Sequence, residues 1–393
     1  MTIYQEKATQ ATALLRELDL DCWLTFARET GQHPDPGVEL VLGTSLTWNS
    51  ALLFGRGGER VAIVGRFDVE NVRLAGVFDE VVGYDEDLRA PLLETLERLA
   101  PRQIGLNYSV HDHTADGLSA GMERLLRELL HGTSFVERLT SAEALLGRLR
   151  ARKTPSEVER IAAAVATTEE ILAWLTPQIR VGASEAELAA LVHGEFARRG
   201  LPSAWDWEYC PTLNTGPDSP LGHVAPQPHI RVQPGHLVHI DLGVRQDGYC
   251  SDLQRMWYVL RPGESLPPPE IQRAMHTVVA AIEAGAAALR PGVAGWEVDA
   301  AARQVVVAAG YPEYRHALGH GLGRACHDGG PLLGPRWPRY GTAPEQLVEA
   351  GHVYTLELGV PTPAGYLALE EDVVVTNTGC RFISSFQREL WLR

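Results

Sequence analysis

The chain has 393 residues, which is longer than an average single domain, so its length favours two domains. Its composition, 45% hydrophobic and 22% charged, is that of an ordinary globular protein, and no segment approaches the roughly 18 consecutive apolar residues of a membrane span. A formal net charge of −15 disfavours nucleic acid and anionic lipid as partners. Acidic residues interrupt the first thirty positions, so we expect no export signal and a cytoplasmic location.

The N-terminal part alternates helical and extended signals, which predicts a small α/β domain. Helical spacing covers residues 10–18, and extended signals cover 22–26, 50–54, 61–64 and 104–107. Five scattered cysteines fit neither a disulfide framework nor a paired-cysteine metal site, so we expect reduced thiols. They are Cys22, Cys210, Cys250, Cys326 and Cys380.

A helix start marks the predicted domain boundary. Thr154 is placed to cap a helix, Pro155 suits its first position, and Glu157 can complete a capping box. We therefore predict an N-terminal domain over residues 1–150 and a second domain over residues 151–393.

The second domain contains a weak internal repeat. The tripeptide at 180–182 precedes a helix that reaches Gly200, and the tripeptide at 290–292 precedes a helix that reaches Gly310, an offset of 110 in both cases. A further helix comes before each copy and a strand pair follows it. The predicted unit is therefore helix, helix, hairpin, although chance similarity between amphipathic helices would give the same helix pattern.

The first hairpin carries two acids. Residues 237–244 alternate between apolar side chains and a face that carries Asp241. A turn is expected at 245–248, before a returning strand over 249–259. A loop centred in that turn gives opposed residues an index sum of 493, so Asp241 is predicted to face Asp252.

The second hairpin carries two further acidic residues. Residues 354–359 run out, 361–365 turn and 366–376 run back, which gives an index sum of 727 and places Glu357 opposite Glu370. Opposed carboxylates are destabilising as bare pairs, so two such pairs need shared protons or bound cations. Convergence of the four acids on two divalent cations is favoured over acids that point to solvent, provided that no β-bulge shifts either register.

A histidine between glycines supplies the next signal. His320 lies in Gly319-His320-Gly321, and His327 follows seven residues on, so one of them is a candidate nitrogen ligand. A lone histidine is more often a hydrogen-bonded core residue, which is the alternative. Carboxylates with one imidazole suit manganese, zinc, cobalt or iron better than calcium.

In order and spacing, these residues resemble the M24 family of metallopeptidases, the creatinase or pita-bread fold that includes Xaa-Pro aminopeptidase, prolidase and methionine aminopeptidase. The matching segments are 239–243, Asp252, 319–321, 355–359 and 369–376. The resemblance runs from Thr154 to the C-terminus, and the N-terminal part looks like the smaller domain of the Xaa-Pro branch. It implies an α+β protein: a pita-bread catalytic domain with a pseudo-twofold helix-helix-hairpin repeat, preceded by an α/β creatinase-type domain.

The resemblance also implies roles for individual residues. The metal ligands would be Asp241, Asp252, His320, Glu357 and Glu370, which would hold two divalent ions per chain, manganese, zinc or cobalt. Glu357 would also shuttle a proton, while His223 and His327 would bind substrate and act in catalysis. A homodimer is expected only from the resemblance.

Three positions depart from the family pattern: Ala368 in place of a usual arginine, Gln254 in place of a frequent threonine, and Leu358 in place of a common proline. None of these three residues is a predicted metal ligand, so the resemblance still implies hydrolytic chemistry. It leaves the preference for Xaa-Pro peptides open. Three arginines could bind a substrate carboxylate instead, and we name Arg324 as the substrate-binding candidate. They are Arg255, Arg315 and Arg324.

The sequence therefore predicts an exopeptidase of the Xaa-Pro dipeptidase or aminopeptidase type that acts on short peptides. Ala368 leaves open a carboxypeptidase or general dipeptidase. A metal-free member, either a creatinase-like amidinohydrolase or a binding protein, is opposed by the presence of all five ligand residues. Trp205, Trp207 and Tyr209 could line a specificity pocket, the core or a dimer interface.

Overall fold

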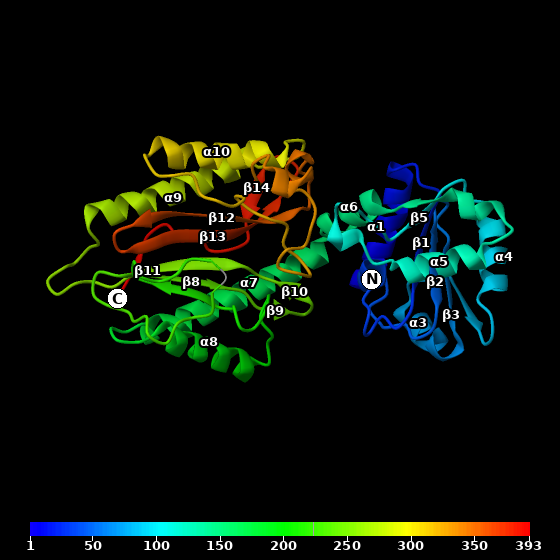
Figure 1. The fold of residues 1–393 in the computed structure, drawn as a ribbon, viewed down its shortest axis with the longest axis horizontal. Coiled ribbons are helices and arrows are strands. Elements are labelled where there is room, and N and C mark those ends of the chain that lie inside the picture. The colour runs from blue at the N-terminus through cyan, green and yellow to red at the C-terminus, as the bar shows by residue number, and fades with distance from the viewer. Residues whose placement is uncertain (223) are drawn as a thin grey trace. The chain divides into compact units, whose positions relative to one another are not determined.

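The computed structural model describes residues 1–222 and 224–393, which form two compact units, Met1–Arg150 and Ala151–Arg393 (Figure 1). Each unit has its own sheet and its own apolar core. No helix within the described ranges combines the length and the apolar content that crossing a membrane requires.

A six-stranded mixed sheet forms the centre of the N-terminal unit, in the order β4-β3-β2-β1-β5-β6. Its strands are β1 (Cys22–Ala27), β2 (Ser50–Gly55), β3 (Arg60–Gly65), β4 (Glu80–Tyr84), β5 (Ile104–Leu106) and β6 (Leu139–Ser141). Its helices are α1 (Ile3–Glu17), α2 (Pro36–Val41), α3 (Val69–Ala75), α4 (Arg89–Leu99), α5 (Ala120–Leu129) and α6 (Glu143–Ala151), the last of which ends at the boundary.

Successive side chains of β1 enter two different cores, because neighbouring residues of a strand point to opposite faces. Leu24 packs in one cluster with Leu92 of α4 and Leu126 of α5. Trp23 packs in another cluster with Leu14 of α1. Helices therefore cover both faces of the sheet, as expected for an α/β domain.

An antiparallel sheet in the order β12-β13-β11-β8-β7 forms the centre of the C-terminal unit. Its strands are β7 (Thr212–Thr215), β8 (Leu237–Leu242), β11 (Leu253–Tyr258), β12 (Val353–Thr362) and β13 (Gly365–Val375). Four short strands complete the unit: β9 (Arg245–Gln246) pairs with β10 (Tyr249–Cys250), β14 (Cys380–Phe382) with β13, and β15 (Trp391–Leu392) with β11.

Four long helices pack around this sheet: α7 (Pro155–Leu175), α8 (Glu185–Arg199), α9 (Pro269–Ala288) and α10 (Gly295–Ala308) (Figure 1). Val278 and Ile282 of α9 share one buried cluster with Leu356 and Leu358 of β12. This apolar packing holds β12 in place, so the opposite, polar positions of the strand are fixed as well.

The helix starts confirm the predicted repeat. Thr154 caps α7 with a full capping box, as expected from the sequence. Gly182 and Gly292, 110 residues apart, adopt left-handed backbone with φ of 90° and 86°. Glu187 and Glu297 each accept the backbone amide three residues earlier at 2.8 Å, so α8 and α10 begin with the same device.

The second hairpin has the predicted register, whereas the first does not. In the second, Glu357 pairs directly with Glu370. In the first, Asp241 pairs with Gln254, so the prediction that it faces Asp252 is wrong.

The physical reason is a tight turn, and the break that follows it leaves the register unchanged. Asp247 and Gly248 have φ of 50° and 81°, the backbone of a two-residue hairpin turn, which moves the centre of the hairpin by one residue. The ladder then stops at Ser251 and Asp252, which belong to neither β10 nor β11. The predicted continuous returning strand is therefore interrupted at Asp252.

Candidate metal centre

Five segments of the C-terminal unit bring the predicted ligands together. Asp241 lies on β8, Glu357 on β12 and Glu370 on β13. Asp252 lies in the break before β11, and His320 lies in the loop that follows α10. No two of these positions are neighbours in sequence, so the fold of the unit brings them together.

His320 is surrounded by carboxylates. Its Nε2 atom lies 3.7 Å from Asp252 Oδ2 and 3.8 Å from both Glu357 Oε1 and Glu370 Oε1. Asp241 lies beside this group, since it pairs across the ladder with Gln254, whose amide donates to two of these carboxylates. All five residues that we predicted as ligands therefore lie in one cluster.

Burial dominates the electrostatics of this cluster. It raises the pKa of Asp241 to about 8, with a smaller contribution from the charge of Glu357. Burial, and then the charge of a neighbouring acid, also holds the pKa of Asp252 and of Glu370 well above the usual range. Burial lowers the pKa of His320 to about 3, so its imidazole is neutral and has a lone pair to offer.

The residues fit divalent cations. Asp241 Oδ1, Asp252 Oδ1 and Glu370 Oε1 are buried, and the described residues give none of these atoms a hydrogen-bond donor. Two ligand atoms that each lie about 2.1 Å from one ion can be at most about 4.2 Å apart. The separations of 3.7 and 3.8 Å around His320 Nε2 fall within this limit and exceed the length of a normal hydrogen bond.

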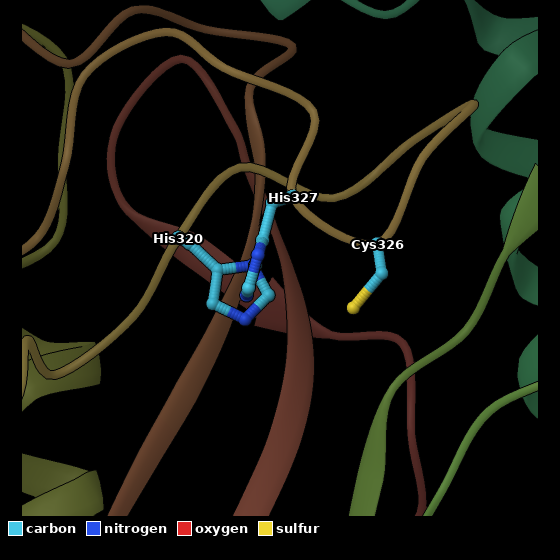
Figure 2. Close-up of side chains that lie close together, drawn as sticks. All are labelled: His320, Cys326 and His327. Carbon is cyan, nitrogen blue, oxygen red and sulfur yellow. The ribbon is translucent and has the colours of Figure 1, made fainter. Parts of the chain in front are cut away.

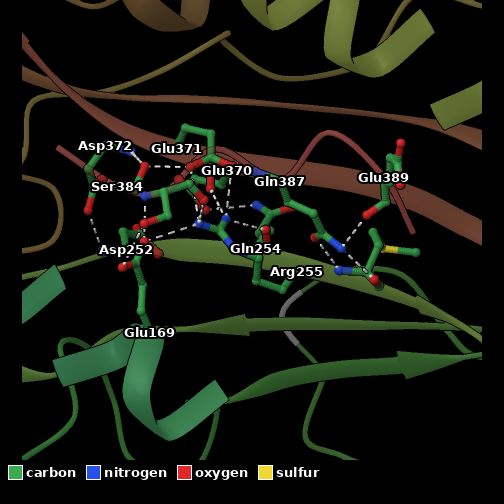
Figure 3. Close-up of polar contacts among 12 residues, drawn as sticks. Glu169, Asp252, Gln254, Arg255, Glu370, Glu371, Asp372, Ser384, Gln387 and Glu389 are labelled. Atoms are coloured by element: carbon green, nitrogen blue, oxygen red, sulfur yellow. Dashed lines mark hydrogen bonds and ion pairs between the residues drawn. The ribbon is translucent and has the colours of Figure 1, made fainter. Parts of the chain in front are cut away.

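The side-chain amide of Gln254, on β11 of the first hairpin, reaches the acids of the second hairpin, and Figure 3 shows it beside Glu370. Gln254 Nε2 donates to Glu370 Oε2 at 2.9 Å and to Glu357 Oε2 at 3.1 Å. On its other side, Gln254 Oε1 lies 2.9 Å from His239 Nε2. The sequence marked this residue only as a departure from a family pattern, and its pairing with Asp241 is what brings it into the cluster.

Buried polar residues contact the backbone of two of the carboxylate residues (Figure 3). Arg255 forms an ion pair of 3.0 Å with Glu371 and donates to the backbone carbonyl of Glu370 at 2.9 Å. The amide of Asp252 donates to Asp372 Oδ2 at 3.2 Å. These contacts fix the backbone of two predicted ligands, Asp252 and Glu370, in one arrangement.

The predicted substrate residues lie in different surroundings. Arg255 is buried in the ion pair described above, and Arg324 is buried with its Nε atom 4.0 Å from Glu157 and its guanidinium over the Tyr249 ring. Arg315 is exposed. The predicted role of Arg324 in substrate binding therefore stays a prediction.

The histidine next to the cluster has an accessible ring. His327 is exposed, and its ring lies edge-on to that of His320 with the centroids 4.2 Å apart. The other predicted catalytic histidine, His223, lies outside the described residues. The ring of Trp207 stacks on that of His193 with the centroids 4.3 Å apart, and the side chain remains partly exposed. The sequence had left open whether this side chain lies in a pocket, in the core or at an interface.

A thiol was missed by the sequence analysis. Cys326 Sγ donates to Asp252 Oδ2 at 2.9 Å, and its side chain lies beside His320 and His327 (Figure 2). The sequence does contain a signal for this thiol, since Cys326 directly precedes His327, a predicted catalytic residue. We treated all five cysteines as scattered thiols and did not use that signal.

Comparisons with known proteins agree on one family. A model described as metallopeptidase family M24 matches residues 159–377, more than half of the chain. YkvY of Bacillus subtilis is 29% identical over 326 residues, which cover 81% of this chain and 82% of that protein. An Xaa-Pro dipeptidase of Pyrococcus furiosus is 29% identical over 282 residues, which cover 70% and 74%.

A solved structure shows the same fold over the whole length. The Xaa-Pro dipeptidase from Bacillus anthracis has a TM-score of 0.75 and 23% identity, and the match covers 99% of this chain and 100% of that one. The fold is the pita-bread fold with its smaller N-terminal domain. The five clustered residues all fall inside the range that the family model matches, and the chain belongs to metallopeptidase family M24.

Proposed function

We propose that this metallopeptidase is a dinuclear-metal exopeptidase that hydrolyses short peptides, of the Xaa-Pro dipeptidase or aminopeptidase type. The observation that carries the proposal is the neutral imidazole of His320, which has three carboxylates within 3.8 Å of its Nε2 atom and a fourth, that of Asp241, beside them. The family implies divalent metal ions, and the buried oxygens without donors are suited to hold them. Manganese, zinc and cobalt are the candidate ions.

The contacts suggest how the ligands divide between two ions. Asp252 contacts Asp241 on one side and lies 3.7 Å from His320 on the other, which suits a bridging ligand. Glu370 is 1% exposed and lies 3.8 Å from His320, so it is the second bridging candidate. Asp241 would complete the ligands of one ion, and His320 and Glu357 would complete those of the other.

Divalent ions held by these residues would supply a nucleophile from water at neutral pH and would polarise the carbonyl that is attacked. Glu357 is suited to take and return a proton, because its side chain is 22% exposed and Gln254 holds one of its oxygens. The exposed imidazole of His327 is suited to donate a hydrogen bond to the carbonyl oxygen as negative charge develops there.

One observation favours a second candidate, a general dipeptidase or carboxypeptidase. Ala368 is buried opposite Gly359, so no cation is present where Xaa-Pro enzymes usually carry arginine. Arg255 is held by Glu371 and cannot easily replace it. Xaa-Pro peptides and other dipeptides therefore need to be compared directly.

The test is a panel of dipeptides and tripeptides, with and without proline after the first residue, free or blocked at each end. Purified protein is freed of metal with a chelator and then loaded with manganese, zinc or cobalt. We expect turnover of unblocked Xaa-Pro peptides only after loading. Cleavage of N-blocked peptides from the C-terminal end would favour the second candidate, and the absence of any turnover at full metal occupancy would refute both.

We also propose that the enzyme works as a homodimer in the cytoplasm. The support is the resemblance stated above and the scattered free cysteines, which suit a reducing compartment. Light scattering on the purified protein tests the first part, and fractionation of the source cells tests the second.

A further inference from the structure

One cysteine of the chain reaches the carboxylate cluster. Cys326 Sγ donates to Asp252 Oδ2 at 2.9 Å, and the side chain is 8% exposed. The nearest ligand atoms of His320, Cys326 and His327 lie within 4.8 Å of one another (Figure 2). One sulfur and two nitrogen donors therefore lie near one another at the edge of the proposed centre.

A second observation indicates that a ligand belongs beside this thiol. Asp252 is 4% exposed, and its other oxygen, Oδ1, has no donor among the described residues. The same holds for Glu370 Oε1. A buried carboxylate oxygen without a donor is costly, and a cation that contacts it would remove that cost.

The loop that carries the thiol is fixed in place. Asp328 forms a buried ion pair of 2.8 Å with Lys153 and accepts the backbone amide of Ala325 at 3.2 Å. Gly323 allows this close packing, since a Cβ atom there would lie 2.1 Å from Asp328 Oδ2. The contacts of its own loop thus hold Cys326 toward the cluster, which favours a ligand over a thiol that is there by chance.

We propose that Cys326 is a sulfur ligand to one ion of the proposed centre, and that it makes the centre prefer zinc or cobalt to manganese. The inference rests on the proposed function and adds to it a ligand type. Thiolate sulfur favours zinc and cobalt, whereas manganese prefers oxygen donors. The sulfur-to-metal bond forms as the S–H bond breaks, and the proton now shared with Asp252 leaves to solvent.

The test uses the full-length protein loaded with cobalt(II) and its absorption spectrum. We expect visible ligand-field bands together with an intense near-ultraviolet band from sulfur-to-cobalt charge transfer. The variant Cys326→Ser should keep the visible bands and lose the near-ultraviolet band. The matched control is Cys380→Ser, because Cys380 is on β14 and donates to the carbonyl of Ala286, and this variant should keep both.

Competition with a chromophoric chelator gives a second readout. Loss of a partner of a ligand typically costs about 10- to 100-fold in metal affinity, so removal of a ligand should cost at least about tenfold. We expect Cys326→Ser to lose this much affinity for zinc and much less for manganese. Equal losses for both metals would overturn the stated preference.

The outcomes separate the two proposals. Visible bands without a near-ultraviolet band in the unmodified protein would overturn the sulfur ligand and leave the carboxylate centre standing. Failure of the unmodified protein to bind cobalt would overturn the proposed metal centre and the sulfur ligand together. The spectrum of the unmodified protein decides the question even if Cys326→Ser does not fold.

Discussion

The two halves of the C-terminal unit begin alike and end differently. Their second helices start with the same glycine and glutamate device, 110 residues apart. Their hairpins differ, because the first turns at Asp247 and Gly248 and breaks at Asp252, whereas the second is continuous through Glu357 and Glu370. A common helical frame therefore tolerates unequal hairpins while four acids still meet.

The break in the first hairpin leaves the amide and the carboxylate of Asp252 available for contacts outside the ladder. Because Asp252 is outside the ladder, its amide is free to bind Asp372 and its carboxylate can reach Asp241, His320 and Cys326. In the second hairpin, direct pairing places two acids together and leaves the amide of Gln254, from the first hairpin, to bind both. The two acids of the second hairpin thus accept hydrogen bonds from a residue of the first hairpin.

The largest effect should come from removing a central acid of the second hairpin. Glu370→Gln should lower kcat/KM roughly 10³-fold, because a proposed bridging ligand is lost and with it several kcal/mol of transition-state stabilisation. Asp241→Asn, at the edge of the cluster in the first hairpin, should lose less. Kinetics and metal content measured on both variants give the comparison.

The same substitution should have the opposite effect on stability without metal. Glu370→Gln removes one of several crowded buried carboxylates, so the metal-free variant should unfold at a higher temperature than the metal-free parent. Calorimetry after chelation measures this. A lower unfolding temperature would show that the acids are not mutually repulsive and would weaken the cation argument.

A smaller effect should follow from removing the donor that links the hairpins. Gln254→Met keeps the length of the side chain and removes the hydrogen bonds to Glu357 and Glu370. Metal affinity should fall by about 10- to 100-fold, as is typical for residues that orient a ligand. Chelator competition measures it, and an unchanged affinity would mean that the amide does not position these acids.

Local rules predicted one hairpin and failed on the other. In the second hairpin the centre of the turn was read correctly, so Glu357 was placed opposite Glu370. In the first, the dipeptide Asp247-Gly248 is a strong signal for a two-residue turn, and giving it more weight would have paired Asp241 with Gln254. The helix start at Thr154 was predictable because capping depends on neighbours in sequence.

Other features could not be derived from local pattern. At the break in the first hairpin, the amide of Asp252 donates to Asp372, which lies 120 positions further along the chain. The contact of Cys326 with Asp252 spans 74 positions and depends on how the loop after α10 folds. Such contacts are set by tertiary packing, so the sequence could suggest the residue types of the centre and not its full membership.

A change in the first turn should affect stability by a small amount. Gly248→Ala forces a residue with a Cβ atom into left-handed backbone, which costs on the order of 1–2 kcal/mol. Apart from the chain neighbours of Gly248, no atom of the described residues lies within 4 Å of the added methyl group, so the cost comes from the backbone alone. Gly194→Ala is the matched control of opposite sign, because Gly194 is exposed within α8 and alanine should stabilise that helix by about 1 kcal/mol. Denaturant unfolding of both variants measures the difference.

The smallest effect tests whether the two helix starts are equivalent. Ser184 caps α8 by accepting the amide of Glu187 at 3.2 Å, whereas the matching residue before α10, Ala294, has no side-chain acceptor. Ser184→Ala should therefore cost about 1 kcal/mol, and Ala294→Ser should gain up to the same amount, since its backbone is already extended as a cap requires. If Ala294→Ser brings no gain, the glutamate contact that both halves share already satisfies the start of α10, and the missing hydroxyl is a difference in sequence with no cost in stability.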